Sequence, residues 1–314
     1  MISLKHQRNS RISRIIHHPY FEPVASISAV AILIAALFLY TLNWPPMVVV
    51  ESDSMQHGYN DTLGIVNTGD IVLVKKVSVP SSIATYVASE ATGYTTYGEP
   101  GDVILYYPDG QMGTTPVIHR AILWVDYNSS TGSFDAPSLL DLSCPGQYQI
   151  DTQAGTRTCL NNPWTPVTGT LELHDVGWTD ITISIDFSSL AMEPGGPTSG
   201  YITMGDNNHG MYDQKMYGDR CEISCIVQPG WVLGVARGMV PWFGALKLWL
   251  DGNTNDVPAQ SWDYLAVCIG LIIILPFVVP WGVRRLMRGA RDRDRGRKPP
   301  PDDERSSPKQ RQAP

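Results

Sequence analysis

The stretch Val117-Ile-His-Arg-Ala-Ile-Leu-Trp-Val125 consists almost entirely of β-branched, aliphatic and aromatic residues. It predicts a buried β-strand that carries two polar side chains, His119 and Arg120. Four further runs have the same composition and are bounded by Gly, Pro or Asp. They are Asp70–Lys75, Asp102–Tyr107, Trp178–Phe187 and Trp231–Ala236. Because heptads and internal repeats are lacking in this part of the sequence, we expect a mainly β fold built on an antiparallel sheet.

The segments between these strands differ in length and composition. Gly58–Asn67 and Ser81–Gly98 are rich in turn-forming residues and are predicted to be loops. The stretch 126–200 contains two Cys, two Trp and little charge, which indicates a β-rich insertion. This insertion divides the expected core into a first part, 45–125, and a second part with a membrane-proximal segment, 201–262.

Two long apolar runs flank the core, the first uncharged and the second with one charged residue, Asp263. Residues 24–44 and 263–283 each supply about the 20 residues that a helix needs to cross the hydrocarbon of a bilayer. We expect Pro276 to kink the second helix. The alternative for the first run is a cleaved signal peptide, although its apolar stretch exceeds the usual ~7–15 residues. The alternative for the second run is a buried core helix.

The charges of the chain are segregated around these runs. Residues 1–23 contain four Lys/Arg and one acid, residues 284–314 contain eleven Lys/Arg and five acids, and the middle contains eight Lys/Arg and 24 acids. The positive-inside rule therefore predicts a two-pass protein of the cell membrane, with both termini cytoplasmic and the middle outside. The mixed charges and prolines of 284–314 indicate a disordered tail. The acidic middle argues against a broad nucleic-acid-binding face.

Four of the five cysteines lie between the apolar runs, where disulfides are permitted. Cys144 with Cys159 and Cys221 with Cys225 is the economical pairing, although four cysteines allow three pairings. A zinc site at Cys221-x3-Cys225 would lack a second tight pair, so we expect neither a metal nor a cofactor. Cys268 lies in the second apolar run and is expected to be free.

Several short blocks follow the first apolar run in a definite order. They are Val48-Val-Val-Glu-Ser-Asp-Ser-Met55, Thr68-Gly-Asp-Ile-Val-Leu-Val-Lys-Lys76, Pro100-Gly-Asp-Val-Ile-Leu-Tyr106, Val117-Ile-His-Arg120 and Tyr201-Ile-Thr-Met-Gly-Asp-Asn-Asn208. In this order they resemble type I signal peptidases, the serine proteases that remove signal peptides from exported proteins. The resemblance covers the first apolar run and roughly residues 45–125 and 200–245. His119 stands where the bacterial branch has a lysine, so the chain is most similar to the archaeal and endoplasmic-reticulum branch, which is understood as Ser/His/Asp enzymes.

The resemblance implies a signal-peptidase-like antiparallel β catalytic core, and the chemistry of the residues agrees with it. A serine hydroxyl needs a base to take its proton, and a neutral imidazole is suited to that task near pH 7. We therefore assign Ser54 as nucleophile and His119 as general base. By resemblance, the Ser52 side chain and the backbone N–H of Ser54 would form the oxyanion hole. Met55 would line the pocket for the residue before the scissile bond.

The resemblance also implies two acids, one in Gly-Asp-Asn-Asn and one six residues later. Asp206 matches the first acid, but Tyr212 stands at the second position and Asp213 follows it. A one-residue insertion would restore the register, so we assign Asp213 to orient His119 and Asp206 as the supporting acid. The reverse assignment is the alternative. The chain also departs from the family at Gln56-His57, where Glu-Pro is usual, and at Asp53, where Gly is commoner.

Other residues compete for these roles. His57, His174 and His209 are rival bases, and Lys75 and Lys76 could imitate the lysine of the bacterial branch but come too early in the chain. The apolar segment Val240–Leu250 contains three aromatic residues. It is expected either to rest on the bilayer interface or to form a core strand.

The resemblance implies that signal peptides of exported preproteins are the substrates, with small residues at positions −1 and −3. An extended substrate could add to a sheet edge. Membrane lipid and the secretion translocon are further expected partners. The alternatives are a relative specialised for one surface or pilin-like substrate and, from another class, a catalytically inactive membrane-anchored binding module. The acidic middle and the His-type motif favour an archaeal source in a saline medium, which predicts activity that improves with added salt.

Overall fold

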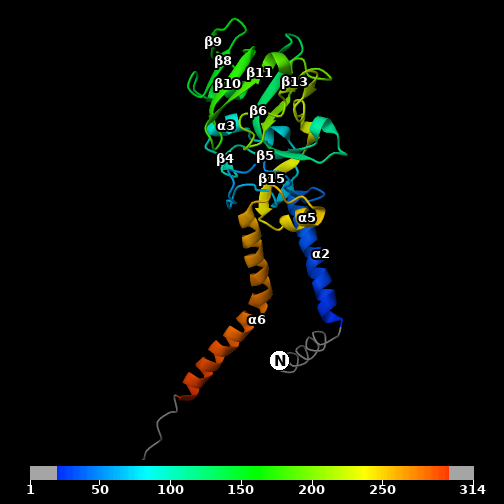
Figure 1. Ribbon diagram of the computed structural model, residues 1–314, viewed down its shortest axis with the longest axis vertical. Coiled ribbons are helices and arrows are strands. Elements are labelled where there is room, and N and C mark those ends of the chain that lie inside the picture. Colours follow the sequence, from blue (N-terminus) through cyan, green and yellow to red (C-terminus); the bar gives the residue numbers. More distant parts are fainter. Residues whose placement is uncertain (1–19, 297–314) are drawn as a thin grey trace, which may run out of the picture. The chain divides into compact units, whose positions relative to one another are not determined.

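The computed structural model describes residues 20–296 (Figure 1). These residues fall into two units, one that ends at Trp262 and one that begins at Asp263, and each is considered by itself. The first unit is rich in β-sheet, and all strand pairs among the described residues are antiparallel. The prediction of a mainly β, antiparallel fold is confirmed at this level.

The larger sheet contains seven strands, in the order β1-β2-β15-β5-β6-β12 with β7 paired to β6. Strand β15, the last in the chain, lies between β2 and β5. Strand β1 pairs only with β2 and is an edge strand of the described sheet. The strands are β1 (Met47–Val49), β2 (Ile71–Lys75), β5 (Val103–Tyr106), β6 (Val117–Asn128), β7 (Ser133–Asp135), β12 (Gly200–Met204) and β15 (Val232–Val240).

The five runs predicted as strands all overlap strands of the structure. The matches are Asp70–Lys75 with β2, Asp102–Tyr107 with β5, Val117–Val125 with β6, Trp231–Ala236 with β15 and Trp178–Phe187 with β11 (Ile181–Asp186). The predicted loop Gly58–Asn67 contains neither helix nor strand.

The stretch 126–200 contains a second sheet of four strands, in the order β11-β10-β8-β9. Its buried side chains form one hydrophobic cluster with those of β6 and β12, and this cluster joins the insertion to the larger sheet. A disulfide between Cys144 and Cys159 closes a loop within the insertion. The remaining elements here are η3 (Pro137–Asp141), β8 (Tyr148–Asp151), β9 (Arg157–Thr158), β10 (Thr170–Val176) and α4 (Phe187–Leu190).

The prediction that Ser81–Gly98 is entirely a loop is wrong, because this stretch contains helix α3 (Tyr86–Glu90). Thr85 caps the helix by accepting a hydrogen bond from the N–H of Ala88, and Tyr86 is buried. A helix of five residues is too short to leave a recognisable apolar period in the sequence. The other short elements are η1 (Pro80–Ser82), β3 (Thr95–Thr96), β4 (Glu99–Pro100), η2 (Pro108–Gly110), β13 (Met216–Tyr217), β14 (Arg220–Cys221) and η4 (Pro229–Trp231).

The larger sheet is buried on both faces where it passes through β5. Val103 and Leu105 belong to one hydrophobic cluster, with Val72 of β2. Ile104 and Tyr106 belong to another, on the opposite face. Successive side chains of a strand point to opposite faces, so a continuous apolar run is what a strand covered on both sides requires.

Helix α2 (Phe21–Thr41) contains residues 24–41 of the first predicted span, which was expected to reach residue 44, and helix α6 (Ala259–Gly296) contains the whole second span, 263–283. By length and composition, their segments Glu22–Thr41 and Ala259–Pro280 suffice to cross a membrane. Helix α6 bends partway along its length (Figure 1) and carries Pro276 inside, a residue that removes a helical hydrogen bond.

The prediction of a disordered tail over 284–314 is wrong at its start, because α6 continues to Gly296. Arginine supplies six of the thirteen residues 284–296 and has a high helix propensity. Residues 1–19 and 297–314 lie outside the described residues. The predictions for the basic N-terminus, 1–23, and for the rest of the tail therefore stay predictions.

The apolar segment Val240–Leu250 does not continue as a strand. Strand β15 ends at Val240, and helix α5 (Ala245–Asp251) follows. Within α5, Leu248 is buried, whereas Trp249 is 64% exposed and Leu250 is 78% exposed. The core-strand alternative is therefore wrong. A surface helix buries the residues on one of its sides and exposes the others, which explains the different burial of neighbouring residues in α5.

Candidate active site

Ser54 lies in the turn that follows β1. The N–H of Val50 donates to the carbonyl of Asp70, which extends the pairing of β1 with the start of β2. The N–H of Gln56 donates to the carbonyl of Asp53 and closes the turn around Ser54. The candidate nucleophile is thus half-buried in a loop that backbone hydrogen bonds fix on both sides.

The acids of the two Gly-Asp turns are structural. Asp70 accepts backbone hydrogen bonds from Asn67 and from Trp242, and burial raises the pKa of its carboxyl to about 6. Asp102 accepts from the guanidinium of Arg237 at 2.6 Å. Both carboxylates tie loops to the ends of strands, so neither is available for chemistry.

The adjacent residues His119 and Arg120 on β6 point to opposite faces of the sheet. His119 pairs with Ile104, so its side chain shares a face with Tyr106, two residues further along β5. Thr203 on β12 pairs with the residue two after His119 and lies on this face as well. The register of three strands therefore gathers His119, Tyr106 and Thr203 on one side and places Arg120 on the other.

Three polar side chains from separate parts of the chain form a continuous hydrogen-bonded line. The distance from Ser54 Oγ to His119 Nε2 is 3.0 Å, and that from His119 Nδ1 to Asp213 Oδ2 is 2.7 Å. Asp213 is fully buried, and its Oδ2 also accepts from the hydroxyls of Tyr106 and Thr203, each at 2.6 Å. Burial and the neighbouring Asp213 raise the pKa of the Tyr106 hydroxyl well above its usual range, so it remains a donor.

Asp206 belongs to a different network on the opposite face. Arg120 donates to both of its oxygens, from Nε at 2.8 Å and from Nη2 at 2.6 Å. Burial raises the pKa of Asp206, but the charge and hydrogen bonds of Arg120 outweigh this effect and the pKa is lowered. His57 Nε2 also lies 3.1 Å from Asp206 Oδ2. Arg120 Nη1 in turn donates to the carbonyls of Thr96, Glu99, Pro100 and Gly101.

The sequence left open which of two acids contacts His119, and the geometry distinguishes them. Asp213 contacts His119, and Asp206 contacts Arg120, which is the arrangement expected from our first assignment. In the loop before Asp213, two residues have a positive φ, His209 at 49° and Gly210 at 85°.

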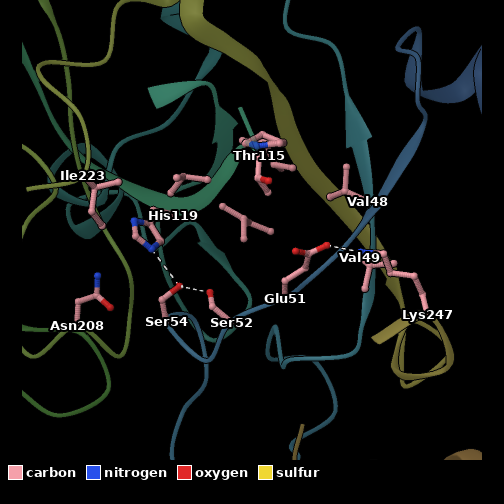
Figure 2. Close-up of a pocket in the computed structure, with 14 residues that line it drawn as sticks. Val48, Val49, Glu51, Ser52, Ser54, Thr115, His119, Asn208, Ile223 and Lys247 are labelled. Atoms are coloured by element: carbon pink, nitrogen blue, oxygen red, sulfur yellow. Dashed lines mark hydrogen bonds and ion pairs between the residues drawn. The ribbon is translucent and has the colours of Figure 1, made fainter. Parts of the chain in front are cut away.

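The other two predicted site residues differ in their placement. The Ser52 hydroxyl is exposed and lies 3.2 Å from Ser54 Oγ, on the side of Ser54 away from His119 (Figure 2). Met55 is 1% exposed and packs in the hydrophobic cluster with Val50 and Val66. Met55 is therefore part of the support beneath the loop, and it is not among the residues that line the cavity in front of Ser54.

A cavity of about 600 Å³ opens in front of Ser54 and His119 (Figure 2). Its walls come from the edge strand β1 and from the start of β6, and they are mostly apolar. An ion pair between Glu51 and Lys247 of α5 lies at one end. The lining residues are Val48, Val49, Glu51, Ser52, Ser54, Leu105, Thr115, Pro116, Val117, Ile118, His119, Asn208, Ile223 and Lys247.

The rival bases lie elsewhere. His57 contacts Asp206, His174 contacts Thr182, and His209 is exposed. The ammonium of Lys75 lies 5.4 Å from the centre of an aromatic ring of α2, and Lys76 is exposed. None of these five side chains has a hydrogen bond to Ser54 among the described contacts.

The candidate zinc pair forms a disulfide between Cys221 and Cys225, as the economical pairing predicts. Among the described residues, these cysteines and Glu193 are the one group of possible metal ligands whose atoms lie close together. Because the two sulfur atoms are bonded to each other, they offer no thiolate to a metal. Cys268 is free, as expected.

Sequence reasoning missed three contributors to this site: Tyr106, Thr203 and Trp178. Tyr106 and Thr203 stood inside quoted blocks, and the period-2 alternation of their strands was the signal that they share a face with His119. Trp178, which stacks on His57, lies in the insertion, and nothing local in its sequence connects it to the site.

No protein-family model matches the chain, and no curated protein matches it significantly.

Proposed function

We propose that this protein is a membrane-bound serine endopeptidase that removes signal peptides from exported preproteins. The observation that carries the proposal is the line Ser54–His119–Asp213, with contacts of 3.0 Å and 2.7 Å, at the wall of an open cavity. A hydroxyl, an imidazole and a buried carboxylate in this geometry have the roles of nucleophile, base and orienting group.

In the proposed reaction, Ser54 Oγ attacks the scissile carbonyl carbon while His119 Nε2 takes the hydroxyl proton. Asp213 holds the Nδ1–H tautomer of His119, which leaves Nε2 free to accept, and it stabilises the imidazolium that forms. When the tetrahedral intermediate collapses, the C–N bond breaks and His119 gives its proton to the leaving amine. Water then repeats the sequence on the acyl-enzyme ester and releases the signal peptide.

The negative oxygen of the intermediate needs donors that are already in place. The Ser52 hydroxyl, beside Ser54 Oγ, and the backbone N–H of Ser54 would supply them. One such donor contributes about 3–4 kcal/mol to the transition state in proteases where it has been removed. Ser52→Ala should therefore reduce kcat more than it changes KM.

The cavity suits an extended, uncharged segment. The free edge of β1 offers backbone groups to a substrate strand, and Val48, Val117 and Ile118 provide an apolar surface for its side chains. In the proposed arrangement α2 and α6 are the two transmembrane helices, both termini are cytoplasmic, and the sheet domain is outside. Ser54 follows α2 by only 13 residues, so it would stay close to the membrane surface, where signal peptides are cut.

The test is cleavage of a preprotein in membranes that contain the wild type, Ser54→Ala or His119→Ala. We expect both variants to lose at least about 10³-fold in rate. His174→Ala is the matched histidine control and should cleave as the wild type does. Undiminished cleavage by Ser54→Ala would exclude the assignment, and absence of cleavage by the folded wild type would favour the inactive binding module.

A further inference from the structure

One side chain of the insertion, Trp178, contacts two residues beside the candidate nucleophile, His57 and Asp206. This residue lies in the turn between β10 and β11, and the hydroxyl of Tyr86 anchors that turn by accepting from the N–H of Gly177 at 3.1 Å. The Trp178 ring stacks on the imidazole of His57, with ring centres 5.5 Å apart and planes inclined by 12°. Its Nε1–H donates to the backbone carbonyl of Asp206 at 3.2 Å.

His57 and Asp206 lie on the two loops that enclose Ser54. His57 comes three residues after Ser54, its side chain is 11% exposed, and its Nε2 is 3.1 Å from Asp206 Oδ2. The residue after Asp206, Asn207, donates its N–H to the carbonyl of Ser54 at 2.8 Å and its side-chain amide to the carbonyl of Asp53 at 3.2 Å.

These contacts close a ring around the nucleophile. The ring runs from the Ser54 loop through His57 to Asp206, and from Asn207 back to the carbonyl of Ser54. Arg120 fixes the Asp206 carboxylate inside the sheet, and Trp178 covers both His57 and the Asp206 carbonyl from the insertion. Among the described residues of the insertion, only the turn that carries Trp178 contacts this ring through a hydrogen bond or a ring stack.

We propose that Trp178 and His57 are positioning residues: together they hold the loop of Ser54 against the loop of Asp206 and so set the distance from Ser54 Oγ to His119 Nε2. This inference rests on the proposed function only for its kinetic readout. Neither residue is among those that line the cavity, and the described side-chain hydrogen bonds of His119 go to Ser54 and Asp213, so both residues would act through the Ser54 loop.

The expected kinetic effect falls on kcat. A displacement of about 1 Å at a reacting atom can cost on the order of a hundredfold in rate. We expect Trp178→Ala to lower kcat by about tenfold to a hundredfold with little change in KM. Trp178→Phe keeps a ring over His57 and should lose less. His57→Gln keeps an N–H donor toward Asp206 and should retain more activity than His57→Ala.

A second readout does not require peptidase activity. In the full-length protein with Ser54→Cys and Cys268→Ser, the single free thiol would lie beside His119, and a thiolate next to an imidazolium forms below the usual pKa of about 8.5. The rate of alkylation by iodoacetamide, measured against pH, reports this contact. Adding Trp178→Ala should move the profile toward that of an ordinary thiol and lower the rate at pH 6.5 by about tenfold.

The matched control is Trp164→Ala, because Trp164 lies in the same insertion and is 70% exposed. It should leave both kcat and the alkylation profile unchanged. The inference is overturned if Trp178→Ala leaves the alkylation profile unchanged and loses activity only in proportion to the folded fraction, measured by thermal melting. If the wild type cleaves no preprotein but the profile shifts as described, the proposed function fails and the positioning role stands.

Discussion

Replacing Asp213 by Asn should change which ring nitrogen of His119 carries the proton, and it leaves a side chain of nearly the same size in the buried site. Oδ2 of Asp213 accepts three hydrogen bonds, from His119, Tyr106 and Thr203, whereas its Oδ1 has no partner among the described residues. An amide cannot reproduce this, because one of its two groups is a donor. If the amide nitrogen faces His119, then Nδ1 must accept, Nε2 carries the proton, and the imidazole cannot take the proton of Ser54.

The opposite orientation of the amide is also unfavourable. It would put the NH2 group in the buried position of Oδ1, where no acceptor is described, at a cost of about 1–3 kcal/mol. It would also leave the imidazolium without a negative partner. If the proposed function holds, we expect kcat to fall by about 10⁴-fold, as it does when the equivalent carboxylate is changed to an amide in a Ser/His/Asp protease, which corresponds to about 5.5 kcal/mol.

Asp206→Asn is the matched comparison, since the substitution is chemically identical. It would remove the charge partner of Arg120, which is 1% exposed, so we expect the free energy of unfolding to fall by about 3–5 kcal/mol. The assay is single-turnover cleavage of a preprotein, with the rate divided by the folded fraction from circular dichroism. Ser54→Ala measures the background.

The reasoning would be refuted if Asp213→Asn kept its rate per folded molecule within about tenfold of the wild type while Asp206→Asn lost about 10⁴-fold. That result would make Asp206 the acid that orients His119. It would also mean that the contact between Asp213 and His119 has no part in the reaction.

Three further predictions concern groups around the site and in the insertion. Tyr106→Phe removes a hydrogen bond to the Asp213 carboxylate, worth about 1.5–3 kcal/mol, and should lower kcat by about tenfold to a hundredfold in the same assay. Burial raises the pKa of Glu193 from 4.5 to about 7, so this acid favours folding when protonated and that contribution is lost as the pH rises from 4.5 to 7. Glu193→Gln should therefore gain free energy of unfolding relative to the wild type through this window, up to about 3 kcal/mol, in denaturant melts at several pH values. Replacing Cys144 and Cys159 by Ala should cost about 3 kcal/mol, because their disulfide closes a loop of 15 residues, and reducing agent should then have a smaller effect on the melts than in the wild type.

Much of the fold could be predicted because the relevant signals are local. The apolar strand runs, the two long apolar segments and the cysteine spacings are each visible within a few residues. The segment of α5 shows where local signals fail. An apolar run this short is compatible with a helix and with a strand, because both would bury apolar residues. The path of the chain after β15 decides which of the two forms.

Some features of the candidate site could likewise be predicted from the sequence, and others could not. Ser54 and His119 stood in ordered blocks and lie together as expected. The choice between Asp206 and Asp213 depends on the path of the loop that joins them, and sequence spacing alone cannot show which acid reaches the imidazole. The contact between His57 and Trp178 joins residues 121 positions apart, and single-sequence patterns do not report such distant pairs.

The place of β15 in the larger sheet sets an order of events during synthesis. A ribosome makes β2 and β5 early, but the strand that lies between them emerges only with residues 232–240. Until then Ser54 is attached to one half of an incomplete sheet and His119 to the other half, without the strand whose backbone hydrogen bonds join the two halves. A nascent or truncated chain that stops before β15 contains all three residues of the line Ser54–His119–Asp213 and should still be inert. We therefore expect activity to appear late in synthesis and in a single step, when β15 inserts into the sheet.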